Sequence, residues 1–155
     1  MMKAPLPSYV DLRARVEDAL GAPTWRPILI GIDGANGTGK SSAASWLAWQ
    51  FGMPVIHLDF YVVRGSRPLK WLNEEVARLI GGRLDEAKRS IIVEGVLLLD
   101  ALAAAKRKAD FLIFVEGEPE GRSLEPLIKG YFERRRPRSR ADFCLPAIDE
   151  ENPPA

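Results

Sequence analysis

The sequence contains almost none of the residues that build disulfide-bonded or zinc-binding proteins. Its 155 residues include one cysteine, Cys144, and one histidine, His57. A single cysteine excludes a disulfide within the chain and a cysteine-rich zinc site. His57 has no second metal ligand at a useful spacing, so we interpret it as a structural or pocket-lining residue. Functions that depend on disulfide or zinc chemistry are therefore disfavoured.

The sequence also lacks a charge bias and long apolar runs. Lysine and arginine number 22 against 21 acidic residues, which gives a formal net charge of +1. This balance argues against nucleic acid or a membrane as the main partner. No stretch approaches the roughly 18 apolar residues of a membrane span, and the N-terminal segment lacks the apolar centre of a signal peptide. We therefore expect a cytoplasmic protein.

What remains is the composition of an ordinary globular domain. Hydrophobic residues make up 46% of the chain and charged residues 28%, and this length is usual for one domain with one core. We expect a single domain over residues 1–155. Its expected parts are a helix over 8–20, a core over 28–115, a lid and C-terminal segment over 116–149, and a frayed, proline-rich tail over 150–155.

Short apolar runs alternate along the chain with segments of helical character. The apolar runs predict strands over 28–32, 54–58, 90–93, 111–115 and 143–145. Helical patterns are found over 8–20, 40–51, 72–80 and 98–106. Alternation of strands and helices is typical of a mostly parallel sheet with helices on both faces. The expected fold is therefore a three-layer α/β/α arrangement.

The strongest functional signal is a glycine-rich turn between the first predicted strand and the second predicted helix. Residues 34–41 satisfy the pattern G-x-x-x-x-G-K-[ST], the phosphate loop or P-loop of nucleotide triphosphatases. The strand before it and the helix after it supply the context that a chance glycine-rich turn would lack. We expect the nucleotide to be bound by the residues of this turn and of the helix start: Gly34, Ala35, Asn36, Gly37, Thr38, Gly39, Lys40, Ser41 and Ser42.

Each part of this turn has a chemical role. Glycines let the backbone curl so that successive N–H groups point at phosphate oxygens, and the helix that follows adds its N-terminal dipole. Lys40 brings a positive charge to the β- and γ-phosphates, which makes it a candidate catalytic residue. The hydroxyl of Ser41 is expected to ligate Mg²⁺. The sequence thus predicts a three-layer P-loop NTPase fold that binds a nucleoside triphosphate.

Three segments of the sequence resemble the uridine kinase family, which sits with phosphoribulokinase, pantothenate kinase and nicotinamide riboside kinase among the P-loop kinases. The first segment, 30–42, contains the phosphate loop. Residues 57–61, His-Leu-Asp-Phe-Tyr, resemble the acidic-aromatic motif of the family after its second strand. Residues 91–98 resemble the third strand and the turn beyond it. The resemblance covers about 28–115 and, more loosely, the arginine-rich segment and residues 141–143.

The resemblance implies transfer of the γ-phosphoryl group of ATP to a hydroxyl of a nucleoside or similar small molecule, with Mg²⁺ as the metal. It implies that Asp59 acts near the acceptor hydroxyl, as a base or as a water-mediated partner of the metal. An acid at the carboxyl end of a parallel strand also reaches the crevice where phosphates lie. Glu94 occupies the matching place on the third strand and is expected to hold Mg²⁺ with Ser41 and Asp59, or to orient the attacking group.

The sequence departs from the family in two places. Many members carry two adjacent acids before the aromatic pair, whereas here Leu58 precedes a single acid, Asp59. The chain is also shorter between Tyr61 and Ser90 and after Val115, where the acceptor pocket and the lid are shaped. A second hypothesis is therefore a nucleotide-binding regulator or a degenerate kinase without phosphoryl transfer. An ATP hydrolase is less favoured, because no strand ends in Asp-Glu.

An arginine-rich segment, 134–140, follows the predicted core. We interpret it first as part of a lid whose arginines neutralise the transferring phosphoryl group. Arg134 and Arg138 are the candidate catalytic arginines, since they are one turn apart if the segment is helical. A solvated basic face is the second interpretation and a nucleic-acid patch the last. Self-association of the chain and the choice between ATP and GTP stay open.

Overall fold

The alternating apolar runs form one five-stranded sheet in the computed structural model, which describes residues 7–147. The strands are β1 (Leu29–Gly34), β2 (Val55–His57), β3 (Ile91–Glu94), β4 (Phe111–Val115) and β5 (Phe143–Leu145). Their order is β2-β3-β1-β4-β5, and every neighbouring pair is parallel. All five predicted strands are thus present, with ends that shift by at most two residues.

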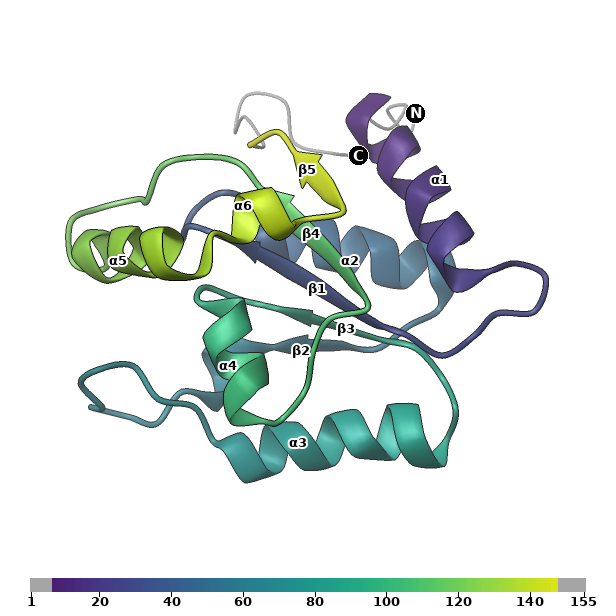
Figure 1. Ribbon diagram of the computed structural model, residues 1–155, viewed down its shortest axis with the longest axis horizontal. Helices are drawn as coiled ribbons and strands as arrows, with labels where there is room; N and C mark the ends of the chain where they lie inside the picture. Colours follow the sequence, from purple (N-terminus) through teal and green to yellow (C-terminus); the bar gives the residue numbers. More distant parts are fainter. Residues whose placement is uncertain (1–6, 148–155) are drawn as a thin grey trace.

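Helices cover both faces of the sheet, as Figure 1 shows. Among the described residues they are α1 (Pro7–Leu20), α2 (Lys40–Phe51), α3 (Asn73–Gly81), α4 (Leu98–Ala104), α5 (Glu125–Arg135) and the short α6 (Pro137–Arg140). Buried side chains of α1 and α2 pack on one face, and those of α3, α4 and α5 on the other. The predicted three-layer α/β/α fold with a parallel sheet is confirmed.

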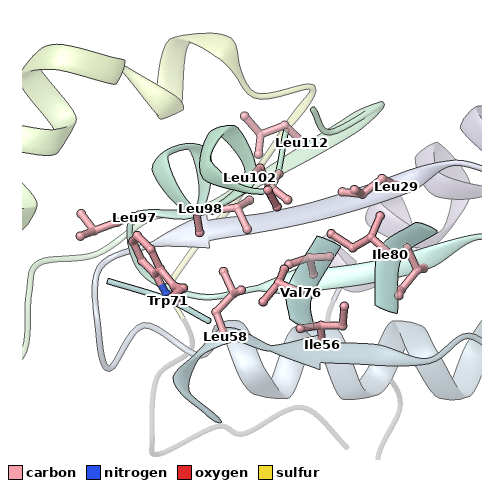
Figure 2. Packing of buried hydrophobic residues seen from close by; sticks show 14 of the residues in the cluster. Leu29, Ile56, Leu58, Trp71, Val76, Ile80, Leu97, Leu98, Leu102 and Leu112 are labelled. Carbon is pink, nitrogen blue, oxygen red and sulfur yellow. The ribbon is translucent and has the colours of Figure 1, made fainter. Parts of the chain in front are cut away.

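Successive side chains of β1 contribute to two hydrophobic clusters, one on each face of the sheet. Ile30 and Ile32 belong to the cluster under α1 and α2, whereas Leu29 belongs to the cluster under α3, α4 and α5. Because successive residues of a strand point to opposite faces, one buried strand serves both layers. The second cluster is drawn in Figure 2, where Trp71 lies with Leu58 and Leu97.

The last third of the chain differs from the expectation of a mobile lid. Residues 125–135 form helix α5, which no periodic pattern had predicted. Ile128 and Tyr131 of α5 are each 1% exposed and pack into the core. The arginine-rich segment therefore begins on a helix that is docked against the sheet. The expected frayed tail, 150–155, lies outside the described residues.

No helix within residues 7–147 is long and apolar enough to span a membrane. The strand order places β1 between β3 and β4: the chain leaves β1 toward β2 on one side, whereas it leaves the neighbouring strand β3 toward β4 on the other side. In open parallel sheets, a crevice forms at such a point outside the carboxyl ends of the strands, and ligands bind there. The predicted phosphate loop follows β1 directly, at this position.

Candidate functional site

The phosphate loop connects the carboxyl end of β1 to the amino end of α2. β1 ends at Gly34 and α2 begins at Lys40. The φ angle is 78° at Gly37 and 98° at Gly39, values that residues with a side chain rarely adopt. The chain therefore turns tightly, and the unpaired N–H groups of the first turn of α2 lie at the edge of the sheet. Together with the helix dipole, these donors form a site for an anion.

Lys40 lies inside this turn. Its Nζ donates a hydrogen bond to the carbonyl oxygen of Ala35 at 2.6 Å, and its side chain is buried. Burial lowers the pKa of Lys40, whereas the nearby carboxylates of Glu94, Asp33 and Asp59 act in the opposite direction. The ammonium group is therefore surrounded by acids, at the position where a bound phosphate would meet it.

Glu94 joins the second and third strands to the phosphate loop. Its side chain is 2% exposed, and Ser41 Oγ donates a hydrogen bond to Glu94 Oε1 at 3.0 Å. His57 Nδ1 lies 2.7 Å from the same oxygen, because His57 and Glu94 are neighbours in the pairing of β2 with β3. Oε2 of Glu94 takes part in no hydrogen bond with the described residues. The structure thus brings two predicted metal-binding residues together and explains the position of the single histidine.

Asp59 completes the group of predicted site residues around one cavity. A cavity of about 380 Å³ is lined by residues of the phosphate loop and of α2, β3 and the segments around them. Its lining residues are Asn36, Gly37, Gly39, Lys40, Ser41, Ser42, Asp59, Glu94, Val96 and Leu124. The carboxylate of Asp59 makes no hydrogen bond or ion pair with the described residues and is exposed. Two acids, a lysine and a hydroxyl therefore face one space.

The structure gives a reason for the single acid in the segment 57–61. Leu58 is 1% exposed and packs against Gly95: a Cβ added to Gly95 would lie 2.8 Å from the Cβ of Leu58. An ionised acid at position 58 would be buried among apolar side chains without a partner, which is costly. The turn Leu58–Tyr61 places Leu58 in the core and Asp59 at the cavity. Asp59 is therefore not displaced by the missing neighbour.

The two predicted lid arginines lie elsewhere. Arg134 forms a two-pronged ion pair with Asp100 of α4, with distances of 2.9 and 2.7 Å. Arg138 of α6 pairs with Glu116 at 2.7 Å and lines a separate, larger hollow of about 800 Å³ beside Phe114 and α6. Neither side chain lines the cavity with Lys40. Their catalytic role stays a prediction, and in this structure both arginines have other partners.

A buried pair beneath the phosphate loop was missed from the sequence. Asp33, the residue of β1 before Gly34, is fully buried and accepts a hydrogen bond from the hydroxyl of Tyr131 on α5. That hydroxyl also accepts a hydrogen bond from the backbone N–H of Leu99 at 3.0 Å. Burial raises the pKa of Asp33 to about 6, although hydrogen bonds from Tyr131 and from the backbone N–H groups of Gly34 and Leu98, together with the charge of Lys40, oppose the rise. The sequence offered one signal for this pair: Asp33 is an acidic residue that directly follows the apolar run 28–32.

A second missed contact joins the segment after β4 to the phosphate loop. The side-chain N–H of Asn36 donates to the carbonyl oxygen of Glu120 at 2.6 Å, and the backbone N–H of Glu120 donates back to Asn36 at 3.2 Å. The side chain of Glu120 lies directly against Gly37, where a Cβ would stand 2.7 Å from that of Glu120. Nothing in the local sequence predicts a contact between residues 84 positions apart. The segment that leads to α5 therefore rests on the loop.

Comparison with known proteins agrees with this architecture. No protein-family model matches the sequence, and no curated protein is similar to it by sequence. Among solved structures, the chain is similar to a possible uridine kinase from Bacillus stearothermophilus, with a TM-score of 0.66 and 18% identity over 89% of this chain and 97% of that one. It is also similar to a candidate fructose transport system kinase from Silicibacter sp. TM1040, with a TM-score of 0.52 and 16% identity over 88% and 85% of the two chains.

The two solved structures define the fold of the molecule. The chain has the fold of the uridine kinase-like P-loop kinases. At 18% and 16% identity these likenesses concern the fold, and the chemistry has to be argued from the residues of this chain.

Proposed function

We propose that the protein is a small-molecule kinase that transfers the γ-phosphoryl group of ATP to a hydroxyl of a nucleoside or similar metabolite. One observation carries the proposal: Lys40 and Ser41 of the phosphate loop line the same cavity as two acids from neighbouring strand ends. Binding of a nucleotide with Mg²⁺ accounts for one acid beside the loop, and the second acid is what supports a transfer step. Since ATP is abundant in the cytoplasm and the chain carries a single thiol, Cys144, we expect it to act there.

In this proposal, residues 34–42 bind the phosphates of the nucleotide. Backbone N–H groups of the turn and of the first turn of α2 donate to phosphate oxygens. Lys40 would leave the carbonyl of Ala35, to which it now donates, and pair with the β- and γ-phosphates. Moving a buried ammonium from a neutral carbonyl to a charged oxygen is favourable, because charge-assisted hydrogen bonds are the stronger ones.

The residues near the loop fit Mg²⁺. The ligands at hand are the hydroxyl of Ser41 and the carboxylates of Glu94 and Asp59, and oxygen is the ligand atom that Mg²⁺ prefers. Oε2 of Glu94 has no protein partner among the described residues, which suits a metal or one of its waters. Within residues 7–147 no group of three His, Cys, Asp or Glu is arranged to hold a metal alone. Mg²⁺ in kinases takes few protein ligands and shares phosphate oxygens, and it would neutralise charge on the transferring group.

The transfer itself would use Asp59. The hydroxyl oxygen of the acceptor attacks the γ-phosphorus, a new O–P bond forms, and the bond between the γ-phosphorus and the β–γ bridging oxygen breaks to release ADP. The hydroxyl proton passes to the carboxylate of Asp59, which is exposed at the cavity and accepts no hydrogen bond from the described residues. A general base must be within reach of the proton that it accepts. Glu94 is held by Ser41 and His57 and is the less available of the two acids.

The proposal is tested with a panel of nucleosides, sugars and other alcohols, each incubated with ATP and Mg²⁺. We expect ATP-dependent phosphorylation of at least one acceptor. The substitution Asp59→Asn removes the base but preserves the shape of the side chain. It should lower kcat by about a hundredfold or more with little change in ATP affinity. Equal losses in kcat and ATP affinity would contradict the role of Asp59 on the acceptor side.

The alternative is a nucleotide-binding regulator without transfer, and the contact between Glu120 and the phosphate loop favours it. That contact would have to rearrange if nucleotide fills the space above Gly37, and such a movement could report nucleotide to a partner. This alternative predicts ATP binding with no phosphorylated product from any acceptor. It also predicts that any effect of Asp59→Asn is limited to Mg²⁺-dependent nucleotide binding.

A further inference from the structure

We propose that the acceptor is an anionic alcohol, one that carries a carboxylate or phosphate group, and that a cationic hairpin of residues 62–71 binds this group. The inference rests on the proposed kinase function and assigns the chemical class of its substrate. Three side chains carry it: Arg64, Arg67 and Lys70, all of which are exposed.

The hairpin stands beside the acid that would receive the acceptor's proton. It begins immediately after the turn Leu58–Tyr61, which holds Asp59 at the cavity. In Figure 1, the segment that joins β2 to α3 projects beyond the sheet at the carboxyl ends of the strands, the edge at which the phosphate loop lies. An acceptor whose hydroxyl meets Asp59 therefore has this segment as a neighbour.

Backbone hydrogen bonds and a buried tryptophan fix the conformation of the hairpin. Val62 and Trp71 form an antiparallel bridge, and the backbone N–H of Val63 donates to the carbonyl of Lys70 at 2.8 Å. The N–H of Leu72 donates to the carbonyl of Tyr61 at 2.7 Å. Trp71 is buried among Leu58 and Leu97 and ties the base of the hairpin to the core (Figure 2). Because the base is fixed, the cations are presented with a smaller entropic cost than on a free loop.

The charges of the hairpin are not balanced by the protein. Between Asp59 and Glu74 the sequence has three cations and no acid. None of these cations takes part in an ion pair among the described residues, whereas six other arginines each pair with a carboxylate: Arg13, Arg78, Arg107, Arg134, Arg135 and Arg138. Like charges on a short turn repel one another, and an anionic ligand would remove that repulsion.

The negative charge of the rest of the site explains why an anionic acceptor needs cations nearby. The cavity already holds the carboxylates of Asp59 and Glu94 and would receive a highly charged triphosphate. An anion brought to this place is repelled unless cations stand nearby. A neutral nucleoside has no such need. Guanidinium groups bind carboxylate and phosphate in a two-pronged manner, which also fixes the direction of the ligand.

The test compares acceptors in pairs in which one member carries an anionic group where the other has a neutral hydroxyl group. Suitable pairs are ribose with ribose 5-phosphate and glycerol with glycerate, so that one arm tests phosphate and the other carboxylate. We expect the anionic member of at least one pair to have the higher kcat/KM. The double variant Arg64→Ala/Arg67→Ala should raise KM for that acceptor by about tenfold to a hundredfold, the range for lost charge-assisted hydrogen bonds. Its kcat and ATP affinity should stay near those of the wild type.

A matched control removes the same charge elsewhere. Arg78 and Arg89 are exposed; Arg78 has only a long, exposed ion pair with Glu75 at 3.9 Å, and Arg89 lies just before β3, at the opposite edge of the sheet. The double variant Arg78→Ala/Arg89→Ala should leave KM unchanged for both acceptors. A preference for neutral acceptors, or a KM that the hairpin variant leaves unchanged, would overturn the inference and leave the kinase proposal standing.

Calorimetry decides the case in which none of these alcohols is phosphorylated. Ribose 5-phosphate and glycerate are titrated into protein loaded with a non-hydrolysable ATP analogue. Binding that Arg64→Ala/Arg67→Ala abolishes supports the anion site. Binding of the analogue without binding of either anion overturns it. Failure of the protein to bind the analogue at all would instead count against the proposed function.

Discussion

At the scale of single residues, the buried acid beneath the phosphate loop is the least expected feature. Asp33 accepts hydrogen bonds from Tyr131 and from the backbone N–H of Gly34, and it lies one residue before the loop. A buried carboxylate is tolerated only when such donors surround it. The pair also links β1 to α5, two elements that are far apart in the sequence. Its removal should therefore affect both stability and the position of α5.

The substitution Tyr131→Phe tests this link. It leaves Asp33 without its phenol donor and the N–H of Leu99 without an acceptor, in a region closed to water. We expect a loss of about 1–3 kcal/mol in the free energy of unfolding, measured by urea denaturation. Tyr61→Phe is the control, because the Tyr61 hydroxyl makes no hydrogen bond with the described residues. Equal effects of the two substitutions would contradict the account.

The raised pKa of Asp33 predicts a specific pH dependence of stability. The pKa is about 6 in the folded protein and 3.8 ordinarily, so between these values the folded state binds a proton that the unfolded state does not. Stability must then fall as pH rises from about 4 to about 6, and level off above. The decline should amount to roughly 2–3 kcal/mol. In Asp33→Asn this decline should be absent. If wild type and Asp33→Asn differ in stability by the same amount throughout this pH range, the prediction is wrong.

At the scale of elements, α5 sets one wall of the site. Leu124, the residue before α5, lines the cavity, and the helix is docked through Ile128 and Tyr131. Arg134 and Arg135 join α5 to α4 through ion pairs with Asp100, and both pairs are partly exposed. Exposed ion pairs contribute little, so the buried side chains carry the docking.

The substitution Ile128→Ala should therefore destabilise the protein by about 2–5 kcal/mol, the range for a truncated core isoleucine. Leu127→Ala, one position away and 37% exposed, should cost much less. Chemical denaturation measures both. Comparable losses would mean that α5 is not anchored by its buried face.

Some of these elements could be predicted from the sequence and others could not. The strands and helices of residues 28–115 were predictable because apolar runs and the glycine-rich turn are local patterns. Helix α5 was not, since its sequence has little periodicity and its stability comes from packing against β1 and α4. The contact of Asn36 with Glu120 and the pairing of Arg134 with Asp100 depend on tertiary structure. The phosphate-loop motif and the family resemblance selected Lys40, Ser41, Asp59 and Glu94, which line one cavity, whereas both candidate lid arginines pair with acids elsewhere.

At the scale of the whole molecule, the account depends on a strand order that brings separate motifs to one edge. The carboxyl ends of β2, β3 and β1 deliver Asp59, Glu94 and the phosphate loop in turn. The sequence separates these residues by up to 60 positions, and the parallel sheet brings them around a cavity of about 380 Å³. In the proposed function, this cavity would bind the end of a polyphosphate and hold an acceptor beside it.

The most direct test of this claim is calorimetric titration of ATP and of AMP, with Mg²⁺, into the wild type and into Lys40→Ala. The wild type should bind ATP at least about tenfold more tightly than AMP, because the loop contacts the outer phosphates through charge-assisted hydrogen bonds. Lys40→Ala should remove most of this preference. Lys108→Ala, an exposed lysine in the turn before β4, should keep it. Equal affinity of the wild type for ATP and AMP, or an unchanged preference in Lys40→Ala, would contradict the account.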